Sequence, residues 1–318
     1  MQVAGYEIIT RAAPTLTFIG MTTGQSSIRR VFPLWAEQLS LDRAQLVGVD
    51  LPLHAEARRY RQAVAQIKYD PLSLGALITT HKLDLFGAAS DLFDELDRFA
   101  RLIGEVSCIS KRGDRLVGHA KDPITSGQSL QHIVKPGYWR SSGGQVLCLG
   151  AGGAAIAIVV HFMTQPDPAD RPKRIALVDI DQAQLDHLQQ VIQRLPATIK
   201  VDAILNNDPH ENDRLVAALP AGSLVINATG LGKDRPGSPI TDQAIFPERG
   251  IVWELNYRGE LMFLHQAQAQ AQPRLLSVHD GWQYFLHGWT EVIAEVFHID
   301  MTPERFDRLA QTAEIVRA

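Results

Sequence analysis

The sequence predicts an α/β fold of two domains built on open, largely parallel sheets. Two observations carry this prediction. Short apolar runs alternate with segments of helical periodicity along the chain, which is typical of strand–helix–strand units. In addition, residues 145–157 read QVLCLGAGGAAIA, so an apolar run, a glycine-rich turn and an Ala-rich helical segment follow one another.

The glycine-rich stretch is the central element of the chain. Val146–Leu149 forms a buried parallel strand, and the helix runs from Ala154 to about Thr164. Glycines allow a tight turn and a close approach of phosphate to the backbone, while a helix N-terminus offers free N–H groups and positive dipole. We therefore expect a Rossmann-type domain whose pyrophosphate site comprises Gly150, Ala151, Gly152, Gly153 and Ala154.

A second predicted strand, Arg174–Asp179, ends in an acid. A carboxylate at this place accepts hydrogen bonds from ribose hydroxyls and repels a 2′-phosphate, so Asp179 favours NAD over NADP. A basic residue of the loop over 171–174 could neutralise that phosphate, which keeps NADP as the alternative. Asp179 could also be a helix N-cap, although Asp181 can take that role. Further along, the strand-end turn Asn227-Ala228-Thr229 is expected to face the cofactor.

The remaining elements follow from apolar periodicity and turn residues. We expect strands over residues 15–20, 44–51, 74–79, 104–110, 115–118, 221–227 and 250–255. We expect helices over residues 31–39, 55–67, 83–89, 181–195, 261–271 and 279–297. The domain boundary is placed near residues 125–131, where a helix could cross between the domains. Residues 1–125, with 278–318 packing back on them, would form the substrate-binding domain, and residues 126–277 the nucleotide-binding domain.

Composition narrows the class of protein. The 318 residues carry a formal net charge of −4, without a basic cluster, which argues against nucleic acid as a partner. No apolar stretch is long enough for a membrane span, and the N-terminus lacks a signal peptide pattern, so we expect a cytoplasmic protein. Cys108 and Cys148 fall in apolar runs as free thiols, and the histidines show no ligand spacing, so we expect no metal.

Lys82 and Asp122 are the candidate catalytic residues. Each follows a predicted strand, at the edge where strand ends can converge on a crevice. Reduction of a ketone needs a proton donor beside the carbonyl, and a lysine ammonium held by a carboxylate can donate the proton and stabilise the developing alkoxide.

The chain resembles the shikimate dehydrogenase family over most of its length. The matching pieces occur in the family's order, and they are ITTHK (78–82), GEVSCIS (104–110), GHAKD (118–122), GAGGAA (150–155), NATGLG (227–232), ELNY (254–257) and HDGW (279–282). The resemblance implies an N-terminal substrate domain, a Rossmann domain and C-terminal helices that return to the first domain. It also implies that Lys82 and Asp122 are the catalytic pair.

Departures from the family pattern fall on the substrate side. Ser26 matches the first of two carboxylate-binding serines, whereas Ile28 replaces the second, and its apolar side chain would crowd a hydrated anion. Ser107 replaces an asparagine in a G-A-V-N-T-like stretch. The other departures are Ile78 for a threonine, with Thr79 adjacent, Ala120 for an asparagine, Gly288 for a glutamine, with His287 adjacent, and Asp179-Ile180-Asp181 for an NADP clamp. We expect Ser26, Thr79, Ser107 and His287 to line the substrate site.

Together these features predict an NAD(P)-dependent oxidoreductase that interconverts a secondary alcohol and a ketone on a small polyhydroxylated molecule. The alternatives are a shikimate or quinate dehydrogenase, a reductase of a keto-sugar or cyclitol, and a non-catalytic nucleotide-binding module. The expected assembly is a monomer or a homodimer.

Overall fold

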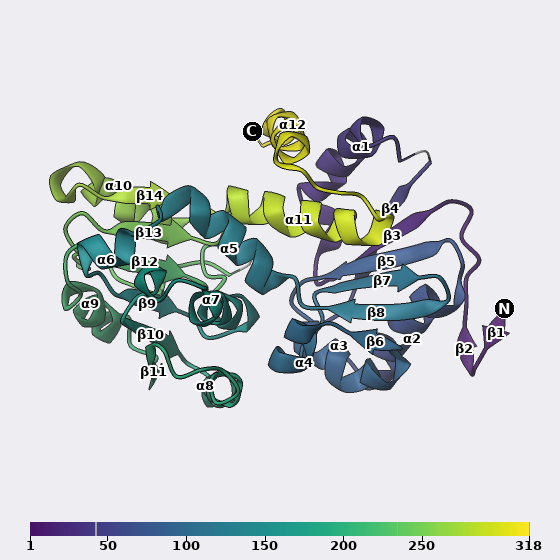
Figure 1. Cartoon of the computed structure of the whole chain (residues 1–318), viewed down its shortest axis with the longest axis horizontal. Helices are drawn as coiled ribbons and strands as arrows, with labels where there is room; N and C mark the ends of the chain where they lie inside the picture. The colour runs from purple at the N-terminus through teal and green to yellow at the C-terminus, as the bar shows by residue number, and fades with distance from the viewer. Residues whose placement is uncertain (42, 234, 318) are drawn as a thin grey trace. The chain divides into compact units, whose positions relative to one another are not determined.

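The computed structural model describes residues 1–41, 43–233 and 235–317, and it divides into two compact units. Unit 1 comprises Met1–Lys121 and Gly288–Ala318, and unit 2 comprises Asp122–His287 (Figure 1). The sequence placed these boundaries at residues 125 and 278. Helix α11 (Trp282–Phe297) begins in unit 2 and ends in unit 1. Among the described residues, no helix is both long and apolar enough to cross a bilayer.

The sheet of unit 1 has the strand order β4-β3-β5-β7-β8-β6. Its members are β3 (Thr15–Gly20), β4 (Gln45–Asp50), β5 (Ser73–Ile78), β6 (Glu95–Leu96), β7 (Cys108–Arg112) and β8 (Arg115–His119). β3 pairs in parallel with β4 and β5, whereas β7 is antiparallel to both β5 and β8. A turn at Gly113, which has a φ of 61°, reverses the chain between β7 and β8 and makes this sheet mixed. A separate N-terminal hairpin joins β1 (Gln2–Val3) to β2 (Tyr6–Glu7).

Helices of unit 1 include α1 (Ile28–Gln38), α2 (Ala57–Tyr69), α3 (Lys82–Ala89), α4 (Arg98–Ile103) and α12 (Pro303–Glu314). The C-terminal part of α11 lies on the sheet, where the ring centroids of Trp289 and Phe18 are 5.0 Å apart. A Cβ at Gly75 would lie 2.7 Å from the Val296 side chain, so this close packing needs glycine on β5. The C-terminal helix α12 packs beside α1, and Trp35 Nε1 donates to the Leu309 carbonyl at 2.8 Å.

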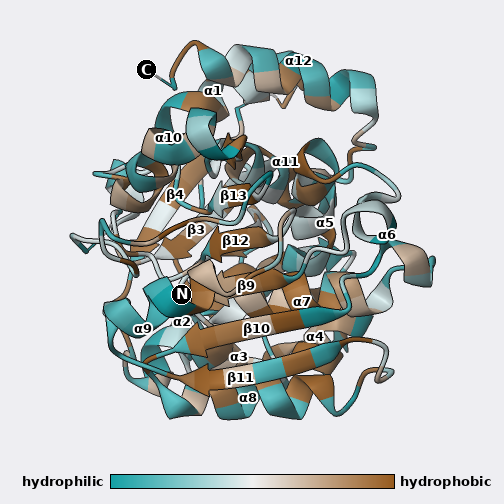
Figure 2. Ribbon diagram, turned by 90° about the vertical axis from the view of Figure 1, so that its left-hand side faces the viewer, coloured by the Kyte–Doolittle hydropathy of each residue, from teal (hydrophilic) through white to brown (hydrophobic). Residues whose placement is uncertain are grey.

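Unit 2 contains a parallel sheet with the strand order β11-β10-β9-β12-β13-β14. Its members are β9 (Val146–Leu149), β10 (Arg174–Asp179), β11 (Lys200–Leu205), β12 (Leu224–Asn227), β13 (Ile251–Glu254) and β14 (Ser277–His279). The chain winds outward from β9 in one direction and then from β12 in the other, so the switch point lies between β9 and β12. Figure 2 shows the strands β9, β10 and β12 as predominantly hydrophobic, as expected for strands covered on both faces. The predicted doubly wound α/β class is confirmed.

The helices of unit 2 are placed around this sheet. They are α5 (Asp122–Ile133), α6 (Tyr138–Ser142), α7 (Gly153–Thr164), α8 (Gln182–Ile192), α9 (Pro209–Ala217) and α10 (Met262–Arg274). α5 packs closely on α7, because a Cβ at Gly127 would lie 2.2 Å from the His161 ring. Burial in this contact lowers the pKa of His161 to about 4, so the imidazole is neutral.

Two glycines of the turn between β9 and α7, Gly150 and Gly152, have different structural roles. Gly150 has a φ of 105°, and a Cβ there would lie 2.7 Å from the Ala228 carbonyl carbon and oxygen. Gly152, at the N-cap of α7, has a φ of −71°, and no described atom lies within 4 Å of its Cβ position. Gly150 is therefore required by the fold, whereas Gly152 leaves space in front of the helix N-terminus.

We predict that Gly150→Ala lowers the free energy of unfolding of unit 2 by about 2 kcal/mol or more, because it adds left-handed strain to a backbone overlap. Gly152→Ala should stay within about 1 kcal/mol of wild type, while its methyl group weakens dinucleotide binding. Urea unfolding measures the stability of the two variants, and calorimetric titration with NAD measures their dinucleotide affinity. Equal stability of the two variants would contradict this account.

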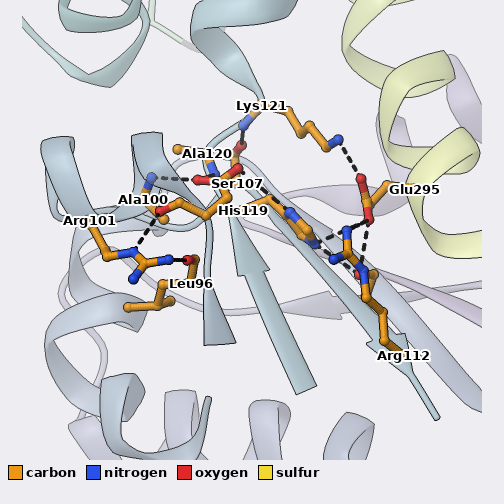
Figure 3. Close-up of polar contacts among 11 residues, drawn as sticks. Leu96, Ala100, Arg101, Ser107, Arg112, His119, Ala120, Lys121 and Glu295 are labelled. Atoms are coloured by element: carbon orange, nitrogen blue, oxygen red, sulfur yellow. Dashed lines mark hydrogen bonds and ion pairs between the residues drawn. The ribbon is translucent and has the colours of Figure 1, made fainter. Parts of the chain in front are cut away.

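A charged network joins α11 to the end of β8 (Figure 3). Lys121 Nζ lies 2.6 Å from Glu295 Oε2, and Arg112 and His119 lie 3.3 and 3.4 Å from Oε1. Burial opposes ionisation of Glu295, but the hydrogen bond from Lys121 and the nearby positive charges win and lower its pKa to about 2. The network therefore fixes the last residue before Asp122 to the helix that returns from unit 2.

The lowered pKa of Glu295 stabilises the fold at neutral pH. Its stabilisation is present above the ordinary pKa near 4.5 and is lost as the pH falls toward 2. We predict that Glu295→Gln lowers the free energy of unfolding at pH 7 by about 2–3 kcal/mol and much less near pH 2. The half-exposed Glu314, which pairs with Arg317, supplies the control Glu314→Gln, expected to cost about 0.5 kcal/mol or less. A Glu295→Gln protein as stable as wild type at pH 7 would refute the assignment.

Candidate active site

Polar residues follow the strand ends of the sheet in unit 1. β5 ends at Ile78, and Thr79 N donates to the Ile19 carbonyl of β3 at 3.1 Å. A Cβ at Gly20 would lie 2.9 Å from Thr79 Oγ1, so a glycine at the end of β3 lets Thr79 lie close beside it. The structure therefore places Thr79 at the carboxyl edge of the sheet, as the sequence predicted.

Lys82 is the first residue of α3 and is half-buried. Burial lowers the pKa of Lys82, and the negative charge of Glu105 partly opposes this shift. A lysine with a lowered pKa gives up its proton more readily than an exposed lysine, which suits a role as a general acid and base.

Glu105 was missed by the sequence analysis. It is 1% exposed, and burial raises the pKa of its carboxyl group, whereas the charge of Lys82 lowers it. Its backbone runs next to α3, since Val106 N donates to the Lys82 carbonyl at 3.4 Å. Comparison with the family's G-A-V-N-T-like stretch could have identified it, because that pattern has alanine where this chain has Glu105.

The segment before Asp122 is held by backbone hydrogen bonds. Lys121 N donates to Ser107 Oγ at 2.8 Å, and Ala120 N lies 3.4 Å from Asp97 Oδ1 (Figure 3). Asp122 then opens α5, where a carboxylate is favoured by the helix dipole. Lys82 belongs to unit 1 and Asp122 to unit 2, and their action as a pair stays a prediction.

Two expected substrate contacts have other partners in the structure. Ser107 is 3% exposed and accepts the Lys121 N–H, so it links strand ends. His287 Nε2 lies 3.0 Å from His132 Nε2 on α5, and burial together with His132 lowers the pKa of His287 to about 3. His132 is ten residues beyond Asp122, which is about 15 Å along the helix. The role of Ser107 and His287 in the substrate wall stays a prediction.

The early loop also differs from expectation at one position. Ser26 follows a short 3₁₀ turn (Thr23–Gln25) and is half-buried, so its side chain remains reachable. Ile28 begins α1 and is 0% exposed, so it packs in the core and does not crowd the loop. Arg29 Nη1 donates to the Leu46 carbonyl of β4 at 2.9 Å, which directs the guanidinium toward β4. Ile28 therefore affects the expected substrate site only because it lacks the hydroxyl group of the family's second serine.

In unit 2, Asp179 is tied to the glycine-rich turn. Its Oδ2 accepts the Ala151 N–H at 2.6 Å, and its Oδ1 accepts the Asp181 N–H at 3.0 Å. Asp181 caps α8 by accepting the Ala183 N–H at 2.9 Å, as the sequence analysis allowed. Asp179 thus lies at the carboxyl end of β10 with its carboxylate fixed beside the turn that Gly150–Ala154 provides.

The turn after β12 completes this edge of the sheet. Asn227 Oδ1 accepts from Thr229 N at 3.1 Å and from Thr229 Oγ1 at 2.7 Å, and Ala228 N donates to the Leu149 carbonyl at 2.7 Å. Asn227 Nδ2 donates to Glu254 Oε2 at 2.7 Å. Burial raises the pKa of Glu254 to about 7, although hydrogen bonds from Asn256 and Asn227 oppose the shift. Glu254 is a further residue of this edge to which the sequence analysis gave no role.

The residues of unit 2 fit a dinucleotide. The N-terminus of α7, the open space at Gly152 and the carboxylate of Asp179 lie at the carboxyl edge of one parallel sheet, beside its switch point. Among the described residues, no cluster of three or more His, Cys, Asp or Glu side chains could hold a metal ion. Cys108 and Cys148 are buried free thiols, and burial raises the pKa of each.

Known proteins share both the sequence and the fold. No family model matches the chain. The shikimate dehydrogenase (NADP(+)) of Streptococcus gordonii is 30% identical over 237 residues, which cover 73% of this chain and 76% of the relative. Shikimate dehydrogenase 1 from Peptoclostridium difficile superposes with a TM-score of 0.71 at 15% identity over 95% of this chain and 98% of that one. The 5-ketofructose reductase of Gluconobacter sp. strain CHM43 superposes with a TM-score of 0.67 at 19% identity, over 96% of this chain and 99% of that one.

The identity to the streptococcal enzyme extends over both units, and the shared fold extends over nearly the whole chain. The chain therefore belongs to the shikimate dehydrogenase family, whose members are NAD(P)-dependent dehydrogenases acting on CH–OH groups.

Proposed function

We propose that this protein interconverts a secondary alcohol and a ketone on a small polyhydroxylated molecule, with unit 1 binding substrate and unit 2 binding the dinucleotide. The observation that carries the proposal is Lys82, a half-buried lysine with a lowered pKa at the carboxyl edge of the sheet. A non-catalytic binding module would not need this costly placement of a charge.

Lys82 is the proton donor and acceptor in this proposal. When bound, the nicotinamide supplies or takes up the hydride at the carbon that carries the oxygen. The Lys82 ammonium donates its proton to the carbonyl oxygen as the alcohol forms, and the neutral amine accepts that proton in the reverse direction. Asp122 orients Lys82 and accepts a hydrogen bond from a substrate hydroxyl, helped by its fixed place at the start of α5.

Several features of unit 1 favour a neutral polyol or its ketone over a carboxylate substrate. Ile28 lies in the core, so the early loop offers the hydroxyl of Ser26 without a second one from that position. Arg29 is directed to β4, which weakens it as a carboxylate clamp. Gly288 stands where the family pattern has glutamine, and outside its own helix and chain neighbours no described atom lies within 4 Å of its Cβ position. Thr79 remains a candidate substrate contact.

The alternative substrates come from relatives. The streptococcal relative is named for shikimate, and the Gluconobacter protein is named for 5-ketofructose. The loss of contacts to a carboxylate favours a keto-sugar or cyclitol as substrate. The sequence identity to a shikimate dehydrogenase favours shikimate or quinate.

Cofactor preference is proposed from Asp179. Its carboxylate lies beside the glycine-rich turn, where it would repel a 2′-phosphate and accept ribose hydroxyls, so NAD is favoured. The printed name of the streptococcal relative specifies NADP(+), which keeps that cofactor as the alternative. The two buried free thiols agree with a reducing compartment, and we infer a cytoplasmic monomer or homodimer.

We predict that purified enzyme turns over a neutral keto-sugar, inositol or related cyclitol with a kcat/KM about 10- to 100-fold above that for shikimate, since one lost hydrogen bond to a charged group has this effect. NADH should be preferred to NADPH. Initial rates at 340 nm with inositols, keto-hexoses, shikimate and quinate, each with both cofactors, measure this. Efficient turnover of shikimate that is lost in Arg29→Ala would restore the ordinary family substrate.

We predict that Lys82→Ala lowers kcat by about 10²-fold or more and leaves NAD affinity nearly unchanged, because a lost acid/base group affects the chemical step. Asp122→Asn should give a similar loss, and the double variant should be far less than additive. The matched control is Lys135→Ala, which removes an exposed lysine beyond α5. Wild-type turnover in Lys82→Ala would show that the catalytic assignment is wrong.

A further inference from the structure

Glu105 places a carboxyl group in the interior of unit 1 where the family pattern has a methyl group. The residue is 1% exposed, and its Oε1 has no hydrogen-bond partner among the described residues. A buried carboxylate without donors is unfavourable unless a positive charge compensates it. The desolvation cost of an ionised Glu105 is therefore tolerable only if a positive charge acts on it.

Lys82 is the cation whose charge acts on the Glu105 carboxyl group. The segment that carries Glu105 runs along the last part of β5 and the start of α3, because Ile78 N donates to the Ser107 carbonyl at 2.8 Å and Val106 N to the Lys82 carbonyl at 3.4 Å. The charges of Lys82 and Glu105 favour each other's ionised forms, while burial disfavours both. Each charge thus partly offsets the cost of burying the other.

Other charged groups around the start of α3 have different partners. Asp84 accepts from Tyr60 Oη at 3.2 Å and lies 3.2 Å from His54 Nδ1. His81 is 0% exposed, its Nδ1 lies 3.1 Å from Tyr60 Oη, and burial lowers its pKa, so it is a neutral neighbour. Asp122, the proposed dyad partner, belongs to unit 2. Glu105 is the carboxylate in the described part of unit 1 whose charge raises the pKa of Lys82 against the effect of burial.

We propose that Glu105 is a second carboxylate partner of Lys82, a positioning residue whose negative charge favours the ammonium form of the lysine until its proton is delivered to substrate. The inference rests on the proposed role of Lys82. It adds a task that the two-residue dyad does not describe, because a lysine buried beside an alanine would lose its proton at a lower pH than one buried beside a carboxylate.

The test measures Lys82 directly and needs no substrate. Acetylation of Lys82 by acetic anhydride, followed across pH by peptide mass spectrometry, gives the midpoint at which the amine loses its proton. Glu105→Gln and Glu105→Ala should each move this midpoint to lower pH by about one unit or more, because the stabilising negative charge is gone. Glu105→Asp, which keeps the charge on a shorter arm, should lie between them and wild type.

A matched control separates charge from packing. Val106→Ala removes buried volume from the adjacent, fully buried residue without touching the carboxyl group. It should lower stability and leave the Lys82 midpoint in place. If Glu105→Gln fails to fold, Glu105→Asp compared with Val106→Ala still decides the matter, since an unshifted midpoint in Glu105→Asp would count against the proposal.

Activity then distinguishes the two proposals. With any ketone that the wild type reduces, the basic limb of the kcat–pH profile should move to lower pH in Glu105→Gln by the same amount as the labelling midpoint. An unchanged midpoint and limb in Glu105→Gln, alongside an inactive Lys82→Ala, overturns the role of Glu105 and leaves the function intact. Full activity in Lys82→Ala overturns the function itself.

Discussion

The chemistry proposed for unit 1 depends on keeping one lysine ammonium half-buried at the carboxyl edge of a sheet. An exposed Lys82 would have an ordinary proton affinity, and a deeply buried, uncompensated one would be neutral or would destabilise the fold. The surrounding residues satisfy both demands. Gly20 lets Thr79 lie close at the strand ends, α3 starts at Lys82, and Glu105 supplies negative charge from the adjacent segment. Substrate recognition can change around this arrangement without altering it.

The network around Glu295 serves the same end beyond β8, where it holds the segment before Asp122. Asp122 follows a segment whose N–H groups are bound by Ser107 and Asp97 and whose Lys121 side chain is paired with α11. The ion pair spans residues 174 positions apart in the chain. A helix from the C-terminal part of the sequence thus fixes the residue that precedes a proposed catalytic carboxylate. At strand ends of unit 2, hydrogen bonds hold the turns: Asn227 links Thr229 to Glu254.

Elements could be predicted from the sequence where a short stretch of residues is by itself enough to determine the local structure. β3, β9 and β10 were placed correctly because each is a continuous apolar run ended by glycine or an acid. β11 was missed because an edge strand with half-exposed faces, KVDAIL, lacks such a run. α12 was missed because its amphipathic face is short, although Thr302 caps it and Pro303 begins it, which is a recognisable start signal.

By itself, the sequence determined the α/β class, the dinucleotide turn and the candidates Lys82 and Asp122, because strand ends and glycine turns are local properties. Tertiary structure decided what each side chain touches. It put Ile28 in the core, turned Arg29 toward β4, paired His287 with His132 and buried Glu105 in the segment beside the start of α3. Burial and proton affinity are properties of the assembled surroundings, since they depend on groups that the chain brings together only after it folds.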